Sequence, residues 1–462
     1  MKKDLELFFN DFLAAFGLDY VNVKDFSFSH EYDHLILDVS LNPTAQSCPI
    51  CGTMSNKIKD YRTKKIKHTV SSLAQCIIHY RARRLVCPIC GKTFYEHNPF
   101  TVKNNKVSVA TVYNVLQELK NCEITFSYVA KKFNLSVSTV TSIFDAHINA
   151  PHLPLSECIS FDETYAFKSA DSDYICVLLD YASGNIIDIL PSRKKIDLMT
   201  YFTNMDKAEL EKVKYVSFDM WKTYRIVAKH VFPNCKCIVD KFHVLQELNR
   251  RVRSVRIEAM NKLKKRRDEL EEKEKLLKES QKKLEPQMQE ELKIAREGYY
   301  LLKKFNFLLT MNDPEAMDPN VKKRFNKVLN RYLNFYDIYE LLLKYDERLR
   351  EAVYFYDRVS EFYKKTEYKN AKKELEEIII ECRTSNIRTI QDFSKTLIEW
   401  KQEIINSFIV IPNIKRKMNN ALIENRNKSI KLLKHSSNGY GNWTRFRKRI
   451  LYCLNKNTSF KL

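Results

Sequence analysis

The chain has 462 residues, of which 79 are Lys or Arg and 57 are Asp or Glu, so its formal net charge is +22. Its length and its 44% of hydrophobic residues allow roughly two to four domains with buried cores. The 7 glycines form neither a GxxxxGK nor a GxGxxG pattern, which excludes a P-loop ATPase and a dinucleotide-binding oxidoreductase. The basic excess favours a polyanion such as DNA as partner, and a merely basic soluble protein is the alternative.

No stretch approaches the length of a membrane span, and acidic residues at positions 4, 6 and 11 interrupt the apolar segment that a secretion signal requires. Of the 12 cysteines, four lie in two close pairs. Such pairs indicate a metal site in a reducing compartment, whereas disulfides would suit a secreted chain. We therefore expect a cytoplasmic protein with no membrane partner.

Two Cys-Pro-Ile-Cys-Gly turns, at residues 48–52 and 87–91, carry these pairs. Each turn presents two thiolates, and its glycine permits the backbone angles that the turn requires. Four thiolates complete a tetrahedral shell, so we predict a structural zinc site in a β-rich domain at 41–104, after an N-terminal segment at 1–40. The predicted ligands are Cys48, Cys51, Cys87 and Cys90. The long spacing between the turns leaves Cys76, His68, His79 and His97 open as substitutes.

Residues 127–146 fit a helix-turn-helix within a domain at 105–150. Apolar residues mark the inner face of both helices, and Ser136 is placed to cap the second helix. The residues predicted to face DNA are Ser138, Thr139 and Thr141 on the second helix and Lys131 and Lys132 on the first. A plain structural helical hairpin is the alternative.

Pro151 and Pro154 mark the clearest domain boundary. Three antiparallel strands followed by two crossover units predict a mixed α/β sheet. The expected strands are residues 157–162, 174–180, 186–190, 213–218 and 237–239, and the expected helices are 197–205 and 224–231.

Beyond residue 241 the pattern is almost wholly helical. Leucines recur every seven residues at 263, 270, 277 and 284, but the complementary heptad positions hold Arg267, Glu274 and Gln281. A helix packed on its own chain is therefore favoured over a dimeric coiled coil.

Asp162 and Asp219 end the first and fourth strands of the predicted sheet. If these strands are neighbours, both carboxylates emerge at one place, and a third acid would complete a site for two divalent metals about 4 Å apart. Glu163, next along the strand, is expected to face away from this site because side chains alternate. Solvated acids at strand ends are the alternative.

Glu424 is the single acid among eleven basic residues between 415 and 449. A lone acid on a DNA-binding surface repels phosphate unless a metal lies between them, so Glu424 is the candidate third acid. Charge compensation by Arg426 and Lys428 is the alternative. The basic residues assigned to DNA are Arg426, Lys428, Lys431, Arg445 and Arg447.

Taken together, these segments resemble the DDE transposases of the ISL-three type insertion-sequence family. The resemblance is carried by CPICG, CPICGKTFYEH, SFDETYAF, VKYVSFDMWKTY, IVDKFHVLQELN and NALIENRNKSIKLLKHSS. It implies an RNase H-like α/β catalytic domain with Asp162, Asp219 and Glu424 as catalytic acids, and Asp240 and His243 as supporting or DNA-positioning residues. The catalytic domain would comprise residues 151–244 and 386–462, interrupted by an all-helical insertion at 245–385.

The resemblance implies a multidomain enzyme that binds terminal inverted repeats, cleaves DNA at the element ends and joins the 3′-OH ends to target DNA. The implied cofactors are catalytic Mg²⁺ or Mn²⁺ and structural Zn²⁺, and the implied partner is double-stranded DNA of element ends and target. We expect a homodimer or higher oligomer on DNA, at the bacterial nucleoid. Two alternatives remain: a DNA-binding regulator without catalysis, and an RNase H-like structure-specific nuclease.

Overall fold

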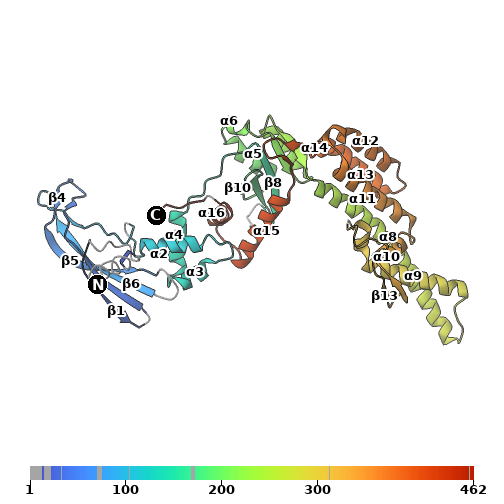
Figure 1. Cartoon of the computed structure of the whole chain (residues 1–462), viewed down its shortest axis with the longest axis horizontal. Helices are drawn as coiled ribbons and strands as arrows, with labels where there is room; N and C mark the ends of the chain where they lie inside the picture. The colour runs from blue at the N-terminus through green and yellow to red at the C-terminus, as the bar shows by residue number, and fades with distance from the viewer. Residues whose placement is uncertain are drawn as a thin grey trace.

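The computed structural model describes residues 13–14, 22–32, 34–69, 75–102, 105–167, 172–311, 313–456 and 458–461. Residues 1–12, in which we expect no secretion signal, lie outside these ranges. The described molecule is elongated, with the N-terminal strands at one end, an α/β unit at the centre and a group of helices at the other end (Figure 1). No helix in the described part of the chain is both long enough and apolar enough to cross a lipid bilayer.

The N-terminal unit is one sheet that buries Leu37, Ile78 and Tyr80. Strand β2 precedes the first cysteine turn, yet it pairs in parallel with β6, which lies between the two turns. One sheet therefore crosses the division that we placed between residues 40 and 41. Across the sheet the strands are β1 (Val23–Glu31), β2 (His34–Leu41), β6 (Gln75–Val86) and β5 (Ile58–Lys67), with β7 (Thr93–Tyr95) also paired to β6.

Three helices follow, α2 (Val109–Glu118), α3 (Phe126–Lys132) and α4 (Val137–His147). The turn between α3 and α4 contains Asn134 in the left-handed region, with φ of 51°. Ser136 caps α4 by accepting a 3.1 Å hydrogen bond from the Thr139 amide. The two helices and their cap therefore match the prediction as a helical pair.

The central sheet has the predicted mixed arrangement. The first three strands are antiparallel neighbours, and β11 pairs in parallel with both β8 and β12. Its strand order is β10 (Ile186–Leu190), β9 (Ile175–Asp180), β8 (Cys158–Thr164), β11 (Tyr215–Phe218) and β12 (Lys236–Val239). The helices between strands are α5 (Lys195–Thr203), α6 (Lys207–Leu210) and α7 (Lys222–Val231).

The two faces of this sheet belong to different hydrophobic cores. One face packs on α5 and α7, where the Phe161 ring lies 5.7 Å from Phe202 and 5.6 Å from Tyr224. The opposite face contributes Val177 and other residues to a core shared with α2, α3, α4, α15 (Ala421–Ser436) and α16 (Trp443–Leu454). The predicted DNA-reading helices are thus packed on the back of the sheet.

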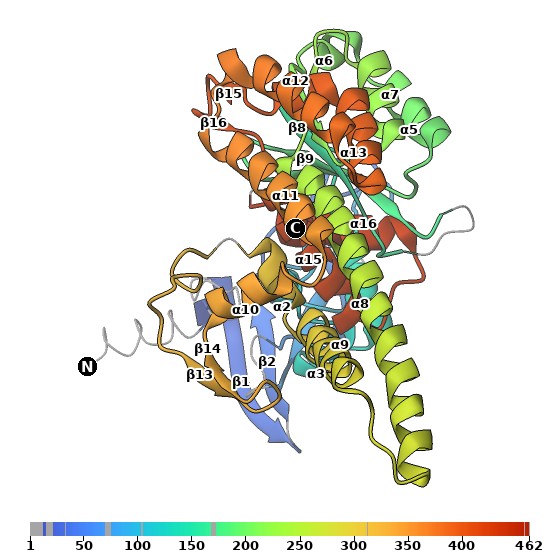
Figure 2. The same ribbon diagram turned by 90° about the vertical axis from the view of Figure 1, so that its right-hand side faces the viewer.

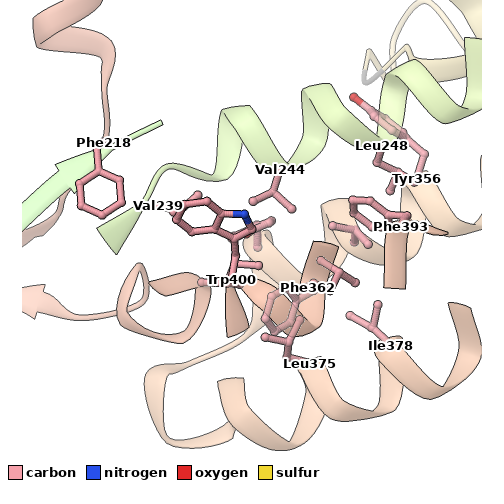
Figure 3. Packing of buried hydrophobic residues seen from close by; sticks show 14 of the residues in the cluster. Phe218, Val239, Val244, Leu248, Tyr356, Phe362, Leu375, Ile378, Phe393 and Trp400 are labelled. Atoms are coloured by element: carbon pink, nitrogen blue, oxygen red, sulfur yellow. The ribbon is translucent and has the colours of Figure 1, made fainter. Parts of the chain in front are cut away.

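The helical segment continues the first core (Figure 3). Trp400 packs beside Val239 of the sheet and Val244 of α8, and its ring lies 6.4 Å from Phe218. The segment contains α8 (Lys241–Glu279), α9 (Pro286–Lys304), η2 (Asn306–Thr310), α10 (Phe335–Leu342), α11 (Glu347–Lys365), α12 (Tyr368–Thr384), α13 (Arg388–Glu399) and α14 (Lys401–Asn406). Short hairpins within this part of the chain are β13 (Arg324–Asn326) with β14 (Arg331–Leu333), and β15 (Val410–Ile411) with β16 (Arg416–Lys417).

The leucine heptads of α8 pack against α9 of the same chain, and the two helices project as a hairpin (Figure 2). Leu270 and Leu284 are buried with Leu292, and Leu277 packs against this group. This confirms the prediction of a helix packed on its own chain and leaves these leucines covered without a coiled-coil partner.

Candidate active site and metal centre

The four predicted zinc ligands lie together, between the β3 (Gln46–Ser47) and β4 (Met54–Ser55) hairpin and the turn from β6 to β7. Sulfur–sulfur distances are 3.7 Å for Cys48–Cys90, 3.5 Å for Cys51–Cys87 and 3.6 Å for Cys51–Cys90. A tetrahedral site with Zn–S bonds of about 2.3 Å has sulfurs roughly 3.8 Å apart. The four thiolates therefore fit a closed structural zinc site, with no position left for a catalytic water.

Both cysteine turns share one backbone geometry. The amide of Gly52 donates to the Cys48 carbonyl at 2.9 Å, and that of Gly91 to the Cys87 carbonyl at 3.1 Å. Both glycines have positive φ, 74° and 68°, which explains why glycine stands at these positions. A hydrogen bond with Thr53 lowers the pKa of the Cys51 thiol to about 6, which favours the thiolate that binds metal.

The four alternative ligands point elsewhere or make other contacts. Cys76 is buried in the sheet core, and its pKa is raised by burial to about 11. His68 Nδ1 lies 2.9 Å from the Ser108 hydroxyl, and His79 Nδ1 lies 3.3 Å from Asp38. Within the described ranges, the cysteines form the one set of three or more candidate ligand atoms that all lie within 4.8 Å of one another, and His97 is not part of it.

The two strand-end aspartates emerge side by side. Residues 215–217 of β11 pair with residues 158–160 of β8 in parallel register, and continuing this register by two positions sets Asp219 opposite Asp162. The predicted neighbouring of the first and fourth strands is therefore correct. This adjacency was open to sequence reasoning only through the strand order of the predicted fold.

Helix α15 lies across β8 and brings Glu424 to the same edge. Asn427 of α15 donates from Nδ2 to Asp162 Oδ2 at 2.8 Å. Glu424 precedes Asn427 by three residues, so the two side chains share a helix face. Asn427 was missed by the sequence analysis, although its spacing from Glu424 was a usable signal.

The electrostatics of the aspartates reflect this gathering. Burial raises the pKa of Asp162 to about 7, and the charges of Asp219 and Glu424 add to the rise. Burial also raises the pKa of Asp219 to about 7, where Glu163 adds to the rise and Arg193 opposes it. Crowded carboxylates of this kind require a cation to be ionised together.

Asp240 and His243 tie the start of α15 to the start of α8. Asp240 Oδ1 accepts from the Phe242 amide at 2.9 Å and so caps α8, while Oδ2 accepts from the Asn420 amide at the start of α15. Asn420 Nδ2 also lies 3.2 Å from His243 Nε2. Burial lowers the pKa of His243, which favours the neutral ring. Both residues therefore support the helix that carries Glu424.

Glu163 corrects one expectation. It follows Asp162 on β8 and points to the opposite face, as the alternation requires, but that face is not remote from the site. Glu163 is ion-paired with Arg193 and its charge acts on Asp219. The Arg193 guanidinium lies 4.3 Å from the Tyr174 ring centre and 4.7 Å from that of Trp221. Arg193 thus links the segments that carry the two aspartates, a role that no local motif revealed.

The basic residues assigned to DNA fall into two groups. Lys428 and Lys431 are exposed on α15 and follow Glu424 at helical spacing, on one face. The arginines instead make contacts within the chain: Arg426 donates to the Gly184 carbonyl at 2.9 Å. Arg445 pairs with Asp145 of α4 and Arg447 with Asp188 of β10, both at 2.6 Å. This corrects the expectation that all five charges are available to phosphate.

The residues predicted to read DNA also differ in their surroundings. Ser138 and Lys131 are exposed. Lys132 is ion-paired with Glu118 at 2.7 Å, so its charge is compensated within the chain. The Thr139 hydroxyl lies 2.8 Å from that of Ser136, and Thr141 donates to the Val137 carbonyl at 2.6 Å.

The acidic site has the oxygen donors that a hard divalent cation prefers. Two buried carboxylate oxygens, Asp219 Oδ1 and Glu163 Oε2, have no hydrogen-bond partner among the described residues. Such oxygens are costly to bury unless something binds them. The residues therefore fit a magnesium or manganese site, with the acids standing too far apart for one compact ligand cluster.

Comparison with known proteins bears on the same segments. A family model for DDE transposases of the ISL3 type, described as "Transposase", matches residues 159–450. A second model, described as the zinc-finger of transposase IS204/IS1001/IS1096/IS1165, matches residues 44–90.

A curated relative is similar over a smaller part. The transposase for insertion sequence element IS1001 of Bordetella parapertussis is 24% identical over 234 residues, which are 49% of this chain and 57% of the relative. The match therefore spans little more than half of that protein. The transposase model itself covers more than half of this chain, including both strand-end aspartates and Glu424. With its four-cysteine zinc ribbon and its acid-bearing α/β sheet, the chain belongs to the ISL3 family of DDE transposases.

Proposed function

We propose that this transposase binds the terminal inverted repeats of its own insertion sequence, cleaves DNA at the element ends and joins the 3′-OH ends to target DNA. The proposal rests chiefly on the hydrogen bond from Asn427 to Asp162, because it supports a site in which Glu424 faces the two aspartates. The order of three antiparallel and two parallel strands supports an RNase H-like core that the helices α8 to α13 interrupt.

In this proposal Asp162, Asp219 and Glu424 hold Mg²⁺ or Mn²⁺. When bound, the metal would neutralise the crowded carboxylates and activate first water and then the 3′-hydroxyl for attack on phosphorus. Asn427 and the Glu163 amide, which donates to Asp162 Oδ1 at 2.8 Å, fix the orientation of that carboxylate. Asp240 and His243 hold the start of α15 and so position Glu424.

The DNA contacts are divided between surfaces. The helical pair α3 and α4 reads bases in the major groove through Ser138 and its neighbours, and Lys131 contacts phosphate. Lys428 and Lys431 guide the backbone along α15 towards Glu424. A homodimer or higher oligomer brings the two element ends together.

The test uses purified protein and labelled element-end DNA, with random DNA of equal length as control, in the presence and absence of Mg²⁺. The parent should cut end DNA only with Mg²⁺. Asp162→Asn, Asp219→Asn and Glu424→Gln should bind end DNA as well as the parent does and cut none of it. Glu272→Gln, an exposed change of equal chemistry on α8, should cut normally.

Two results would contradict the proposal. Binding without cutting by the parent under all metal conditions would favour a regulator, against its membership of a catalytic family. Cutting of branched DNA irrespective of end sequence would favour a structure-specific nuclease.

A further inference from the structure

A cavity of about 100 Å³ lies where the first turn of α8 meets β16 and the residues that lead into α15. Lys241, Tyr363 and Lys417 line it, with Phe408 at one side. Its residues are neither the proposed metal ligands nor the helical pair. Its place in the chain is close to the active site, because Lys241 follows Asp240 and Lys417 precedes Asn420 by three residues.

Tyr363 presents an unused hydroxyl here. The residue is only 8% exposed, and its hydroxyl has no hydrogen-bond partner among the described residues. Its ring is held by stacking on Phe408, with centroids 5.5 Å apart and planes within 1°. Burial raises the pKa of Tyr363, so the hydroxyl keeps its proton and is available as a donor. A buried donor without an acceptor costs stability, which is regained when an acceptor binds.

The cavity is also positively charged. Burial lowers the pKa of Lys417, and the charge of Lys241 lowers it further, so the two ammonium groups repel each other. Neither lysine has an ion pair within the described ranges, and Lys417 lies 4.7 Å over the Phe408 ring. Lys241 is the first residue of the 39-residue helix α8, whose N-terminus adds partial positive charge. The nearby carboxylate of Asp240 uses both oxygens in backbone hydrogen bonds.

We propose that this cavity binds one phosphate group of the DNA backbone beside the active site. Two lysines, a helix N-terminus and a donating tyrosine hydroxyl are complementary to a phosphate in charge and hydrogen bonding. The cavity is too small for a nucleotide base together with its sugar. The inference rests on the proposed function, since it names a contact through which the same site holds its DNA.

The test is a binding experiment without Mg²⁺, so that it does not depend on cleavage. Element-end DNA carries a neutral methylphosphonate at one backbone position at a time, and its affinity for the full chain is measured by fluorescence anisotropy. For the parent, at least one position near the cleavage point should bind roughly tenfold more weakly, as expected for the loss of a charge-assisted contact.

Two variants connect that position to the cavity. Tyr363→Phe and Lys417→Ala should each weaken binding of unmodified DNA, and the sensitive methylphosphonate should cause no further loss in either. Lys417→Ala should also flatten the salt dependence, by about 0.9 in the slope of log K against log salt. Lys372→Ala on α12, which removes one exposed charge elsewhere, should keep the full methylphosphonate effect. Thermal melting checks that Tyr363→Phe is folded, since it removes a hydroxyl that the free protein does not use.

Titration with inorganic phosphate distinguishes the two sources of the anion. Tight phosphate binding that Tyr363→Phe abolishes, without a sensitive DNA position, would identify a free-anion site and overturn the inference. A sensitive position whose effect persists in both variants would also overturn it. If binding shows the expected pattern but the acid variants still cut DNA, the phosphate site stands and the proposed catalytic assignment fails.

Discussion

Burial contributes more than neighbouring charge to the behaviour of Asp162 and Asp219. Burial is the largest cause of the raised pKa in both groups, and the other acids add smaller effects. A carboxyl group in such a place is stable when protonated or when it binds a cation. Ionisation and metal binding at this site are therefore linked.

The first prediction follows from the sign of that linkage. The folded pKa near 7 lies above the usual 3.8, so the folded state binds the proton more tightly, and metal-free stability falls as pH rises from about 4 to about 7. Asp219→Asn should therefore stabilise the metal-free protein more at pH 8 than at pH 5, by a difference on the order of 2 kcal/mol. Thermal melting at both pH values measures it. Mg²⁺ should raise the melting temperature of the parent chiefly at pH 8, and equal effects at both pH values would refute the linkage.

The second prediction concerns Arg193, which pairs with Glu163 and lies between two aromatic rings. Its charge lowers the pKa of Asp219, so Arg193→Gln should shift the acidic limb of the cleavage pH profile to higher pH. Arg193→Lys keeps the charge and loses the planar contacts, so it should lower the rate without that shift. Lys194→Gln, an exposed neighbour with the same charge loss, is the control. A purely structural Arg193 would leave the profile unmoved in all three variants.

Helices α8 and α9 show how a sequence repeat can find its partner within the chain. Their leucines meet across the hairpin, and Gly298 of α9 lies at the closest approach. A Cβ at Gly298 would stand 2.7 Å from Leu263 and 2.7 Å from Tyr345. Glycine is therefore required there by packing.

The third prediction is that Gly298→Ala destabilises the protein by about 1–3 kcal/mol, despite the higher helix propensity of alanine. Denaturant unfolding measures the change. Gly441→Ala, where nothing lies within 4 Å of the added atom, should cost much less. A stabilised Gly298→Ala protein would show that the two helices are more loosely packed than the structure has them.

The chain as a whole contains three large cores, and their boundaries differ from the order of the motifs. The helical segment shares one core with the central sheet, and the helical pair shares another with the opposite face of that sheet. Arg449, only 1% exposed, reinforces the second by donating to the carbonyls of Asn121 and Ile124 at 2.9 and 2.8 Å. The N-terminal sheet has a core of its own. Only that sheet is therefore free to unfold alone.

The fourth prediction tests this division. Cys87→Ser should release zinc and unfold the N-terminal sheet, while residues 105–456 keep a single cooperative transition. Metal analysis and calorimetry measure the two effects, and a strong chelator should reproduce them in the parent. Zinc retained at one equivalent by the variant would exclude Cys87 as a ligand, and loss of the main transition would show that the cores are coupled.

Features encoded by neighbouring residues were predictable from the sequence. The cysteine turns, the Ser136 cap and the alternating strands each depend on a few adjacent side chains, so local spacing identifies them. The placement of Asp162 and Asp219 at strand ends followed in the same way. The motif resemblance then pointed to Glu424, although no local rule connects it to residues more than two hundred positions earlier.

Contacts between distant segments depended on how the cores close. The pairing of β2 with β6, the bond from Asn427 to Asp162 and the internal pairs of Arg445 and Arg447 join segments that are brought together by burial of many apolar residues at once. An arginine in a basic stretch has the same sequence whether it meets phosphate or a carboxylate of its own chain. Only the tertiary structure distinguishes the two, because the partner is set by the packing of the surrounding helices and sheet.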